Sequence, residues 1–345
     1  MWSFDWKTYL FNHGFVLTTY PQTIMQGMNM QALDQIFFEI KNHTGLITLN
    51  RPSALNALNL SMIKTLSCQL TEWEKDPRVK MVTILSSSIK AFCAGGDLKE
   101  LYNIYLAHHK NIAPLKNIIK EFFDEEYKLN AKVKHYSKPY IAILNGISMG
   151  GGLGLSIHGS LRIALNNLVL AMPETSIGYF TDAGATYFLS RTEGELGTYI
   201  ALTSTRLNAT EALSIGLIDQ IIGEAPKENV LFQHRELIND CFRYNAMEDI
   251  LEALLKNNSP FAMKTYNELT RRSPTGLKLT LHILRMARNA DFDTCMEREH
   301  KLALFFLTQP DFYEGIRAAV IDKDKNPTWV PDKLSDVKVS NLNIF

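Results

Sequence analysis

The sequence predicts an α/β protein, with a core of alternating strands and helices and a helical region at its C-terminal end. Up to about residue 223, short runs of β-branched and apolar residues alternate with amphipathic helical patterns. From there to about residue 321, helical patterns follow one another without a clear strand between them. We therefore expect an N-terminal extension over residues 1–30, an α/β core over 31–230 and a helical C-terminal region over 231–345.

The elements of the core follow from local patterns in the chain. A hairpin is expected with strands at 35–41 and 46–50, because these apolar runs flank turn residues at 42–45. An amphipathic helix over 60–75 ends at Asp76-Pro77, since proline cannot continue a helix. The remaining expectations are a buried strand at 79–87, helices from about 98 and over 111–135, a buried strand at 140–146, short strands at 162–167 and 168–174, and helices at 183–191, 194–203 and 208–216.

The segment 139–161 carries no formal charge and is long enough to span a bilayer. It also contains Asn145 and six glycines, and it begins at the proline of Ser137-Lys138-Pro139. This composition favours a buried strand, a glycine-rich turn and a buried helix over a membrane span.

Composition and charge limit the classes of function. The 36 basic and 36 acidic residues cancel, which gives no reason to expect nucleic acid or an anionic membrane as the main partner. The four cysteines are far apart in the sequence and are expected to be free thiols in a reducing compartment. The first 30 residues lack the patterns of transit peptides and secretory signals, so we expect a cytoplasmic protein.

Two glycine-rich turns each lie between a strand candidate and a helix candidate. One is AFCAGGD at 91–97, and the other is NGISMGGGLGL at 145–155. Backbone N–H groups at such turns can bind an anion or an oxyanion. Taken alone, the first turn is better explained as an ordinary connection with Asp97 as the helix N-cap.

Three known sequence motifs can be compared with the second turn. Neither the dinucleotide-binding spacing G-x-G-x-x-G nor the P-loop sequence fits it. The nucleophile-elbow pattern G-x-S-x-G does fit, with Ser148 as the nucleophile. This serine-hydrolase alternative needs a later acid and a later histidine (His234, His282 or His300), and the upstream His-Gly-Gly motif is missing.

Two lone carboxylates stand in AMPETSIGYFTDAGATYF, residues 171–188. Glu174 and Asp182 are the only acidic or basic residues in this apolar stretch. Buried carboxylic acids have raised pKa values and can exchange protons near neutral pH. Each alone could be structural, Asp182 as an N-cap and Glu174 in a salt bridge. Combined with two glycine turns that can offer N–H groups to one oxygen, they indicate acid/base or nucleophilic chemistry beside an oxyanion hole.

Several motifs resemble the crotonase superfamily of enoyl-CoA hydratases and isomerases, from about Gln35 to Pro331. The motifs are LNRPSALNAL (49–58), KAFCAGGDL (90–98), NGISMGGGLGLSIHG (145–159), MPETSIGYFTDAGATYFLSR (172–191) and DFYEGIRAAVIDKDKNPTWVP (311–331). The last motif resembles the branch of the superfamily that hydrolyses CoA thioesters. The resemblance implies a crotonase-like spiral of stacked β-β-α units with a helical C-terminal region.

The resemblance also implies roles for individual residues. The backbone N–H groups of Gly96 and Gly151 would form the oxyanion hole, and the backbone at Ala57 and Ala94 would line the coenzyme A arm. Asn103 stands where relatives usually carry a glutamate that touches the substrate.

The two acids have implied roles of their own. Glu174 would attack the thioester or activate water, two routes that the sequence leaves open. Asp182 would bind the substrate's 3-hydroxyl group and assist proton transfer. Hydratases carry a catalytic glutamate three residues after the oxyanion glycine, where this chain has Gly154.

The expected function is therefore hydrolysis of a short β-hydroxyacyl-CoA thioester, with 3-hydroxyisobutyryl-CoA from valine breakdown as the implied substrate. The alternatives are hydration or isomerisation of an enoyl-CoA, the serine hydrolase above, and a non-catalytic acyl-CoA-binding protein. Coenzyme A would enter only as part of the substrate, with no other cofactor. No metal site is expected, because the nine histidines show no ligand spacing. The resemblance also implies a homo-oligomer, either a dimer or a trimer.

Overall fold

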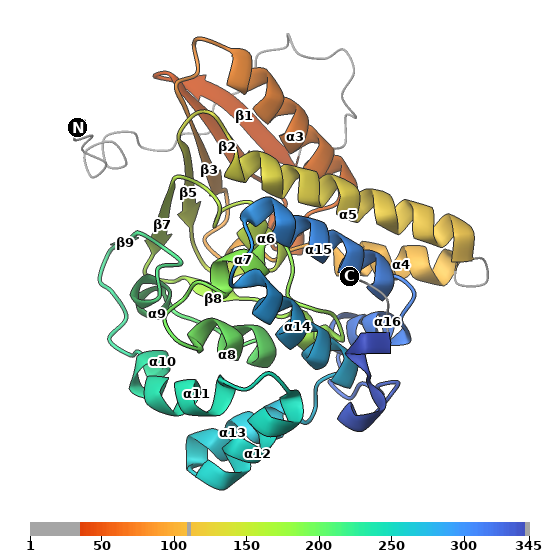
Figure 1. Cartoon of the computed structure of the whole chain (residues 1–345). Coiled ribbons are helices and arrows are strands. Elements are labelled where there is room, and N and C mark those ends of the chain that lie inside the picture. Colours follow the sequence, from red (N-terminus) through yellow and green to blue (C-terminus); the bar gives the residue numbers. More distant parts are fainter. Residues whose placement is uncertain (1–34, 109–111, 342–345) are drawn as a thin grey trace.

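The computed structural model describes residues 35–108 and 112–341 (Figure 1). The predicted extension over residues 1–30 lies outside the described residues. Two sheets form the core, a larger one with strand order β1-β2-β3-β5-β7-β9 and a smaller one with order β4-β6-β8. The larger sheet contains β1 (Ile36–Lys41), β2 (Thr44–Leu49), β3 (Met81–Ser86), β5 (Tyr140–Leu144), β7 (Leu161–Leu165) and β9 (Gln220–Ile222). The smaller sheet contains β4 (Ala91–Cys93), β6 (Ile147–Met149) and β8 (Val169–Ala171).

The helices fall into two sets along the chain. The helices of the core are α3 (Leu60–Lys75), α4 (Leu98–His108), α5 (Ile112–Lys134), α6 (Gly151–Gly154), α7 (Ala185–Leu189), α8 (Leu196–Thr203) and α9 (Ala209–Ser214). The C-terminal helices are α10 (Val230–Gln233), α11 (Arg235–Phe242), α12 (Met247–Asn257), α13 (Pro260–Leu269), α14 (Pro274–Ala287), α15 (Phe292–Phe306) and α16 (Pro310–Ile316). Short helical turns include η1 (Pro52–Ala54) and η2 (Glu174–Ile177).

The predicted hairpin is confirmed, with a tighter turn than expected. β1 and β2 pair antiparallel, with Lys41 opposite Thr44. The two residues between them, Asn42 and His43, both have positive φ, at 49° and 64°. This is the two-residue turn that matches the twist of a hairpin. Thr44 and Gly45, which we expected in the turn, therefore begin the second strand.

The long helices lie where the sequence predicts them, whereas three short strands were not predicted. Helix α3 spans the predicted 60–75, and the Asn59 side chain caps it by accepting from the Met62 N–H at 2.9 Å. β4, β6 and β9 have three residues each, too few for a periodic pattern. The sequence patterns place β4 in a loop and β6 in the glycine-rich turn, and they predict mainly helices after Asp182.

One unit of structure is repeated three times in the core. β3, β5 and β7 lie in the larger sheet, and each leads directly to a short strand of the smaller sheet, β4, β6 and β8. Each short strand is followed by a helical element, α4, α6 or η2. The strand pairs within both series are parallel. This repetition is the predicted spiral of stacked β-β-α units.

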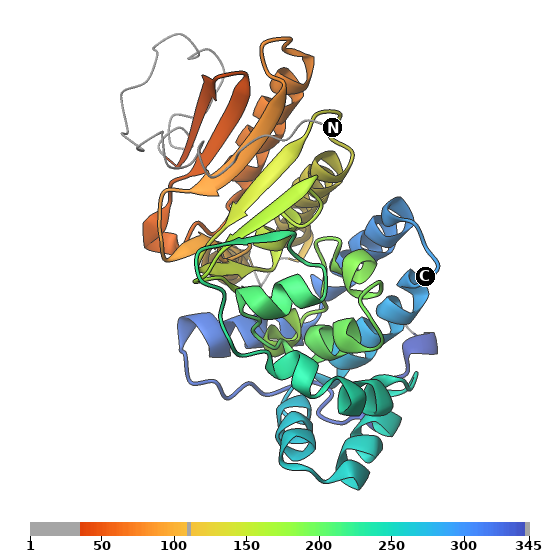
Figure 2. The same cartoon turned by 90° about the vertical axis from the view of Figure 1, so that its left-hand side faces the viewer.

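The C-terminal helices pack onto the core rather than standing apart from it. In Figures 1 and 2, α11 to α13 (cyan) lie at the opposite end of the molecule from the β1-β2 hairpin. Helix α15 packs on α5 and α7, and α16 packs on α4 and η2. Buried apolar side chains from the strands and from α11 to α16 belong to one continuous cluster. Across residues 35–108 and 112–341, none of the helices combines the length and apolarity that crossing a bilayer requires.

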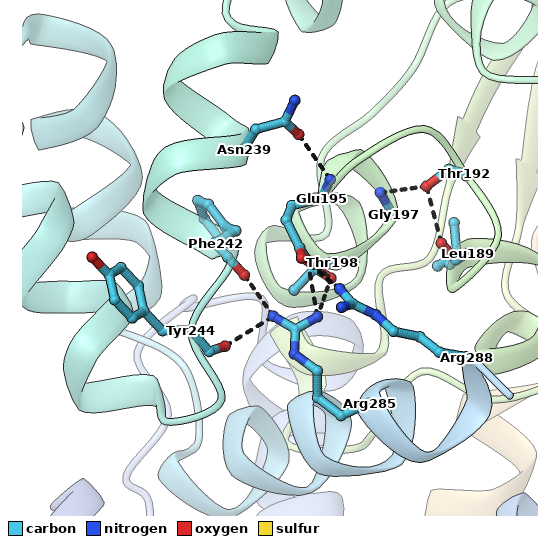
Figure 3. Close-up of polar contacts among 10 residues, drawn as sticks. All are labelled: Leu189, Thr192, Glu195, Gly197, Thr198, Asn239, Phe242, Tyr244, Arg285 and Arg288. Carbon is cyan, nitrogen blue, oxygen red and sulfur yellow. Dashed lines mark hydrogen bonds and ion pairs between the residues drawn. The ribbon is translucent and has the colours of Figure 1, made fainter.

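A buried polar network fastens α14 to the core and to α11 (Figure 3). The Arg285 guanidinium donates to the Glu195 carboxylate at 2.9 Å and to the Thr198 hydroxyl at 3.0 Å. The second terminal nitrogen of the Arg285 guanidinium, Nη2, donates to the main-chain carbonyls of Phe242 and Tyr244. Arg288 pairs with the second Glu195 oxygen at 2.5 Å. One arginine thus joins α14, α8 and the end of α11.

Candidate active site

Three turns lie side by side because the three strands of the smaller sheet are parallel. Cys93 of β4 pairs with Ser148 of β6, and Met149 of β6 pairs with Ala171 of β8. The carboxyl ends of these strands therefore share one edge of the sheet, where ligands commonly bind in open α/β folds. The chain leaves this edge through the two glycine-rich turns and through the segment that begins with Glu174.

A small, partly open cavity of about 60 Å³ lies at this edge. Its polar side is formed by the glycine turns and three acids: Gly95, Gly96, Gly150, Gly151, Glu126, Glu174 and Asp182. Its apolar side is formed by Leu98, Leu101, Phe122, Phe123, Ile177 and Phe312. The structure thus brings five of the predicted site residues together: Ala94, Gly96, Gly151, Glu174 and Asp182.

The two predicted oxyanion glycines are close neighbours. A Cβ placed on Gly151 would lie 3.6 Å from the Gly96 nitrogen. Over the residues that the structure describes, neither the Gly96 N–H nor the Gly151 N–H donates a hydrogen bond to the protein. Gly151 is buried and Gly96 partly buried, and N–H groups in such positions are rarely left without an acceptor. A pair of them lining a cavity suits a developing oxyanion. The oxyanion role of this pair stays a prediction.

Glycine is required in this turn because two carboxyl groups lie against its backbone. A Cβ on Gly150, whose φ is +51°, would lie 2.8 Å from Glu174 Oε1. A Cβ on Gly151 would lie 2.0 Å from Glu126 Oε1. Any larger residue would displace one of the acids, so the glycines bring backbone and carboxyl groups into contact.

Both predicted acids are almost completely buried, with 6% of Glu174 and 5% of Asp182 exposed. Burial and the nearby Asp182 charge raise the pKa of Glu174 well above its usual value. One Glu174 oxygen is buried without a hydrogen-bond partner, and the salt bridges among the described residues do not include this acid. The structural alternative for Glu174, a salt bridge, is therefore wrong.

Asp182 is held by a tyrosine rather than by a helix terminus. The Tyr127 hydroxyl of α5 donates to Asp182 Oδ2 at 2.7 Å. Burial raises the pKa of Asp182 to about 7, and this hydrogen bond acts in the opposite direction. The following helix, α7, has Gly184 as its N-cap, with no side-chain cap. The structural alternative of Asp182 as an N-cap is therefore wrong, whereas Asp97 does cap α4 by accepting from the Glu100 N–H at 3.0 Å.

Sequence reasoning missed a third cavity acid, Glu126 of α5. Burial and the Asp182 charge raise its pKa well above its usual value. Three acids with raised pKa values in one cavity can share and exchange protons near neutral pH. A signal was available, because Glu126 falls on the same helix face as Ile119, Phe122, Phe123 and Asn130, which are all buried.

The predicted substrate-binding residues lie at different distances from the cavity. Ala94 lines it, and its N–H donates to the Leu55 carbonyl at 3.0 Å. Ala57 lies outside the lining, next to Leu58, which bridges to Gly96. Asn103 is exposed on α4, while Leu98 and Leu101 of the same helix face the cavity. The structure therefore does not bring Asn103 to the site, because its position is rotated away from that helix face.

The serine-hydrolase alternative is not supported by the geometry. Ser148 lies within β6, is fully buried and is not part of the cavity wall. Its hydroxyl has no hydrogen-bond partner within the described residues, so no histidine activates it. The nucleophile elbow requires an exposed serine at a sharp strand-to-helix turn. Here the serine is inside the strand, and the turn comes two residues later, at Gly150.

Comparison with known proteins places this site in a family. The model of the enoyl-CoA hydratase/isomerase family matches residues 44–231 and 223–345. The chain belongs to the enoyl-CoA hydratase/isomerase family. It is similar to proteins named mitochondrial 3-hydroxyisobutyryl-CoA hydrolase. The Homo sapiens protein is 37% identical, with 93% of this chain and 92% of that protein covered. The Xenopus tropicalis protein is 39% identical, with 85% and 83% covered.

Solved structures show the same fold. A carnitinyl-CoA dehydratase from Mycobacterium thermoresistibile has a TM-score of 0.83 and 30% identity, covering 90% of this chain and 96% of its own. An enoyl-CoA hydratase from Rhodobacter sphaeroides 2.4.1 has a TM-score of 0.83 and 30% identity, covering 89% and 96%. The predicted crotonase-like fold is confirmed.

Proposed function

We propose that this protein is an acyl-CoA thioester hydrolase that acts on short β-hydroxyacyl groups, with 3-hydroxyisobutyryl-CoA as its substrate. The names of the relatives that share most of this chain support the reaction and the acyl group. One observation on the site carries the proposal: Glu174 faces the same small cavity as the free N–H groups of Gly96 and Gly151. A carboxylate opposite an oxyanion site is suited to acyl transfer.

The proposed chemistry assigns one task to each group. The thioester oxygen accepts from the N–H groups of Gly96 and Gly151, which stabilise the tetrahedral oxyanion. The Glu174 carboxylate either adds to the thioester carbon, giving an anhydride that water cleaves, or takes a proton from an attacking water. In both routes the C–S bond breaks, the acyl carbon gains a water oxygen, and the thiolate leaves as coenzyme A. Asp182 accepts from the substrate's 3-hydroxyl group.

Hydration is the second candidate, because the similar solved structures include a hydratase and a dehydratase. It is less well supported by this site. The second acid that the resemblance implies for hydratases would stand at position 154. A Cβ on Gly154 would lie only 2.4 Å from the Asn130 amide nitrogen, so this position has no room for a carboxylate side chain.

The proposal extends to valine breakdown, which is the pathway of the proposed substrate. Location in the cytoplasm and assembly into a dimer or trimer stay predictions.

One experiment separates the two candidates. The purified protein is incubated with 3-hydroxyisobutyryl-CoA, and free thiol and enoyl absorbance are followed together. Hydrolysis releases thiol, whereas dehydration produces the conjugated enoyl thioester without thiol. Thiol release without enoyl product is the expected result. Enoyl product alone would replace the proposal with a hydratase.

A further inference from the structure

The loop that carries Asp182 is sharply bent and tied down at several points. Ala183 and Gly184, which follow Asp182, both have left-handed backbone conformations, with φ of 58° and 80°. A non-glycine residue in this conformation persists only where its surroundings enforce it. His158 holds the bend from one side, since its Nε2 lies 2.9 Å from the Ala183 carbonyl oxygen. Burial lowers the pKa of His158 to about 4, so the ring is neutral and donates this hydrogen bond.

A fully buried acid from the C-terminal region holds the other side. Glu299 of α15 is 0% exposed. One of its oxygens accepts from the Gly184 N–H at 2.7 Å. The other accepts from the Thr186 N–H at 3.0 Å and from the Thr186 hydroxyl. These N–H groups belong to the N-terminus of α7, which has no capping side chain of its own. The Glu299 carboxyl group thus replaces a local cap.

We propose that Glu299 is a positioning residue for the reaction, fixing Asp182 through its hydrogen bonds to Gly184 and Thr186. Its charge also acts on Glu174 in the same buried cluster. This inference rests on the proposed function, because the kinetic effects expected below are effects on thioester hydrolysis. The side chain of Asp182 is fixed separately by Tyr127 of α5. The acid is therefore located from α5, from His158 and from α15.

Glu299 and the acids near it affect one another's pKa values, so a change at Glu299 should alter the pH dependence of the reaction. Burial raises the pKa of Glu299 to about 8, and Asp182 adds to this. The charge of Glu299 in turn contributes to the raised pKa of Glu174. The other titratable groups facing this cluster are Glu126 and Tyr127 from α5, His158, Tyr179, and Cys295 from α15. His300 of α15 is paired with Asp124 at 2.6 Å. The remaining charges nearby are Lys134 and Arg162 beside His158, and Arg191 and Arg298 beside Cys295.

The variant Glu299→Gln tests both parts of the inference. The amide oxygen of the introduced Gln can still accept from Thr186. The amide NH₂ group then faces the Gly184 N–H, and because both groups are donors, no hydrogen bond can form between them. The buried Gly184 N–H loses its acceptor, and the bend after Asp182 relaxes. We expect kcat to fall roughly tenfold, with KM changed less than about twofold, because the acid is misplaced rather than removed. Where Glu299 is ionised in wild type, above a pH of about 8, its charge opposes ionisation of Glu174. In that range the rising limb of the kcat profile should move to lower pH in Glu299→Gln.

Glu211→Gln is the matched control. Glu211 is also a buried acid that accepts from backbone N–H groups, those of Asn208 at 3.0 Å and Leu231 at 3.1 Å, in the capping box of α9. It does not line the active-site cavity. We expect Glu211→Gln to leave the pH profile of kcat in place. A wild-type kcat and profile in Glu299→Gln, or the same shift in both variants, would overturn the inference.

A second readout needs no turnover. In protein labelled with ¹³C at the glutamate carboxyl carbons, the Glu174 signal is assigned by its absence in Glu174→Gln. Its titration midpoint should move to lower pH in Glu299→Gln and stay in place in Glu211→Gln. If wild-type protein releases no thiol, the proposed function fails, while this titration still decides whether Glu299 acts on Glu174. An unmoved midpoint contradicts the inference.

Discussion

Burial raises the pKa of Asp182, and the hydrogen bond from the Tyr127 hydroxyl limits this rise. This hydroxyl donates to the carboxylate form at 2.7 Å, and burial raises the pKa of Asp182 to about 7 against this effect. A hydrogen bond to the charged form lowers an acid's pKa, so removal of the donor must raise it further. The proposed reaction favours an ionised Asp182, because a carboxylate accepts from the substrate's hydroxyl group more strongly than a protonated acid does.

Tyr127→Phe should therefore move the acidic limb of kcat/KM to higher pH, by roughly one unit. The measurement is the pH dependence of thiol release. Tyr136→Phe is the control, because Tyr136 donates to the Leu70 carbonyl at 2.8 Å and does not line the cavity. A limb that stays in place, or moves to lower pH, contradicts the role given to Tyr127.

Asp182→Asn should stabilise the protein while removing activity. The folded-state pKa of Asp182 is raised from 3.8 to about 7, so the protonated form favours folding. This contribution is present at low pH and is lost as the pH rises through about 7. Asn cannot ionise, so at pH 8 the variant should be more stable by about 1 kcal/mol or more. The gain should shrink towards pH 5 in urea unfolding experiments. Equal stability of both proteins at pH 8 would contradict the burial argument.

At the scale of residues, the sequence identifies a functional acid most clearly where no other charged residue lies nearby in the chain. Glu174 and Asp182 are conspicuous because their stretch has no other charge, and both lie in the cavity. Glu126 was missed because it sits among the many charges of EFFDEEYKLN, where only its helix face distinguishes it. Asn103 was placed at the site by resemblance alone, and the helix turns it to solvent.

Among the elements, α16 brings the C-terminal region to the cavity wall. Its Phe312 ring lies 4.9 Å from the Tyr179 ring centre and 6.4 Å from that of Phe123. Phe312 thus forms part of the cavity wall on the side of α16. The acyl chain length that the enzyme accepts should therefore depend on α16.

Phe312→Ala should relax selection for short acyl groups. We expect the ratio of kcat/KM for a longer β-hydroxyacyl-CoA to that for 3-hydroxyisobutyryl-CoA to rise roughly tenfold. The loss of a buried ring should also cost about 3 kcal/mol of stability. Phe306→Ala is the control, because Phe306 is fully buried against Tyr179 but lies outside the cavity wall. An unchanged ratio in Phe312→Ala, or the same rise in both variants, would contradict this role.

Long elements were predictable because their patterns repeat, whereas the short strands depend on neighbours that are distant in sequence. α3 repeats its apolar face over 16 residues and ends at a proline. β4 and β6 each have three residues and exist as a pair in which Cys93 meets Ser148. The smaller sheet, and with it the edge that holds the site, follows from this long-range pairing. Only the resemblance to a known family indicated it from sequence.

On the scale of the whole molecule, the C-terminal helices complete the site instead of forming a separate unit. Glu299 of α15 and Phe312 of α16 reach the Asp182 loop and the cavity wall. The attachment of these helices to the core is therefore part of the active-site architecture. Arg285 is central to that attachment, since it joins α14 to Glu195, Thr198 and the end of α11 (Figure 3).

Arg285→Ala should lower the free energy of unfolding by roughly 3 kcal/mol, because it leaves a buried carboxylate and two carbonyls without this donor. Arg288→Ala should cost less, since the Arg288 side chain is 40% exposed against 13% for Arg285. Urea unfolding of both variants measures the difference. Equal losses would show that the network is not centred on Arg285.

The most direct test of the central claim is thiol release from 3-hydroxyisobutyryl-CoA by wild type, Glu174→Gln and Ser148→Ala. The proposal predicts turnover in wild type, a loss of at least about a thousandfold in Glu174→Gln, and retained turnover in folded Ser148→Ala. Near-wild-type turnover in Glu174→Gln, or no thiol release by wild type, would contradict it.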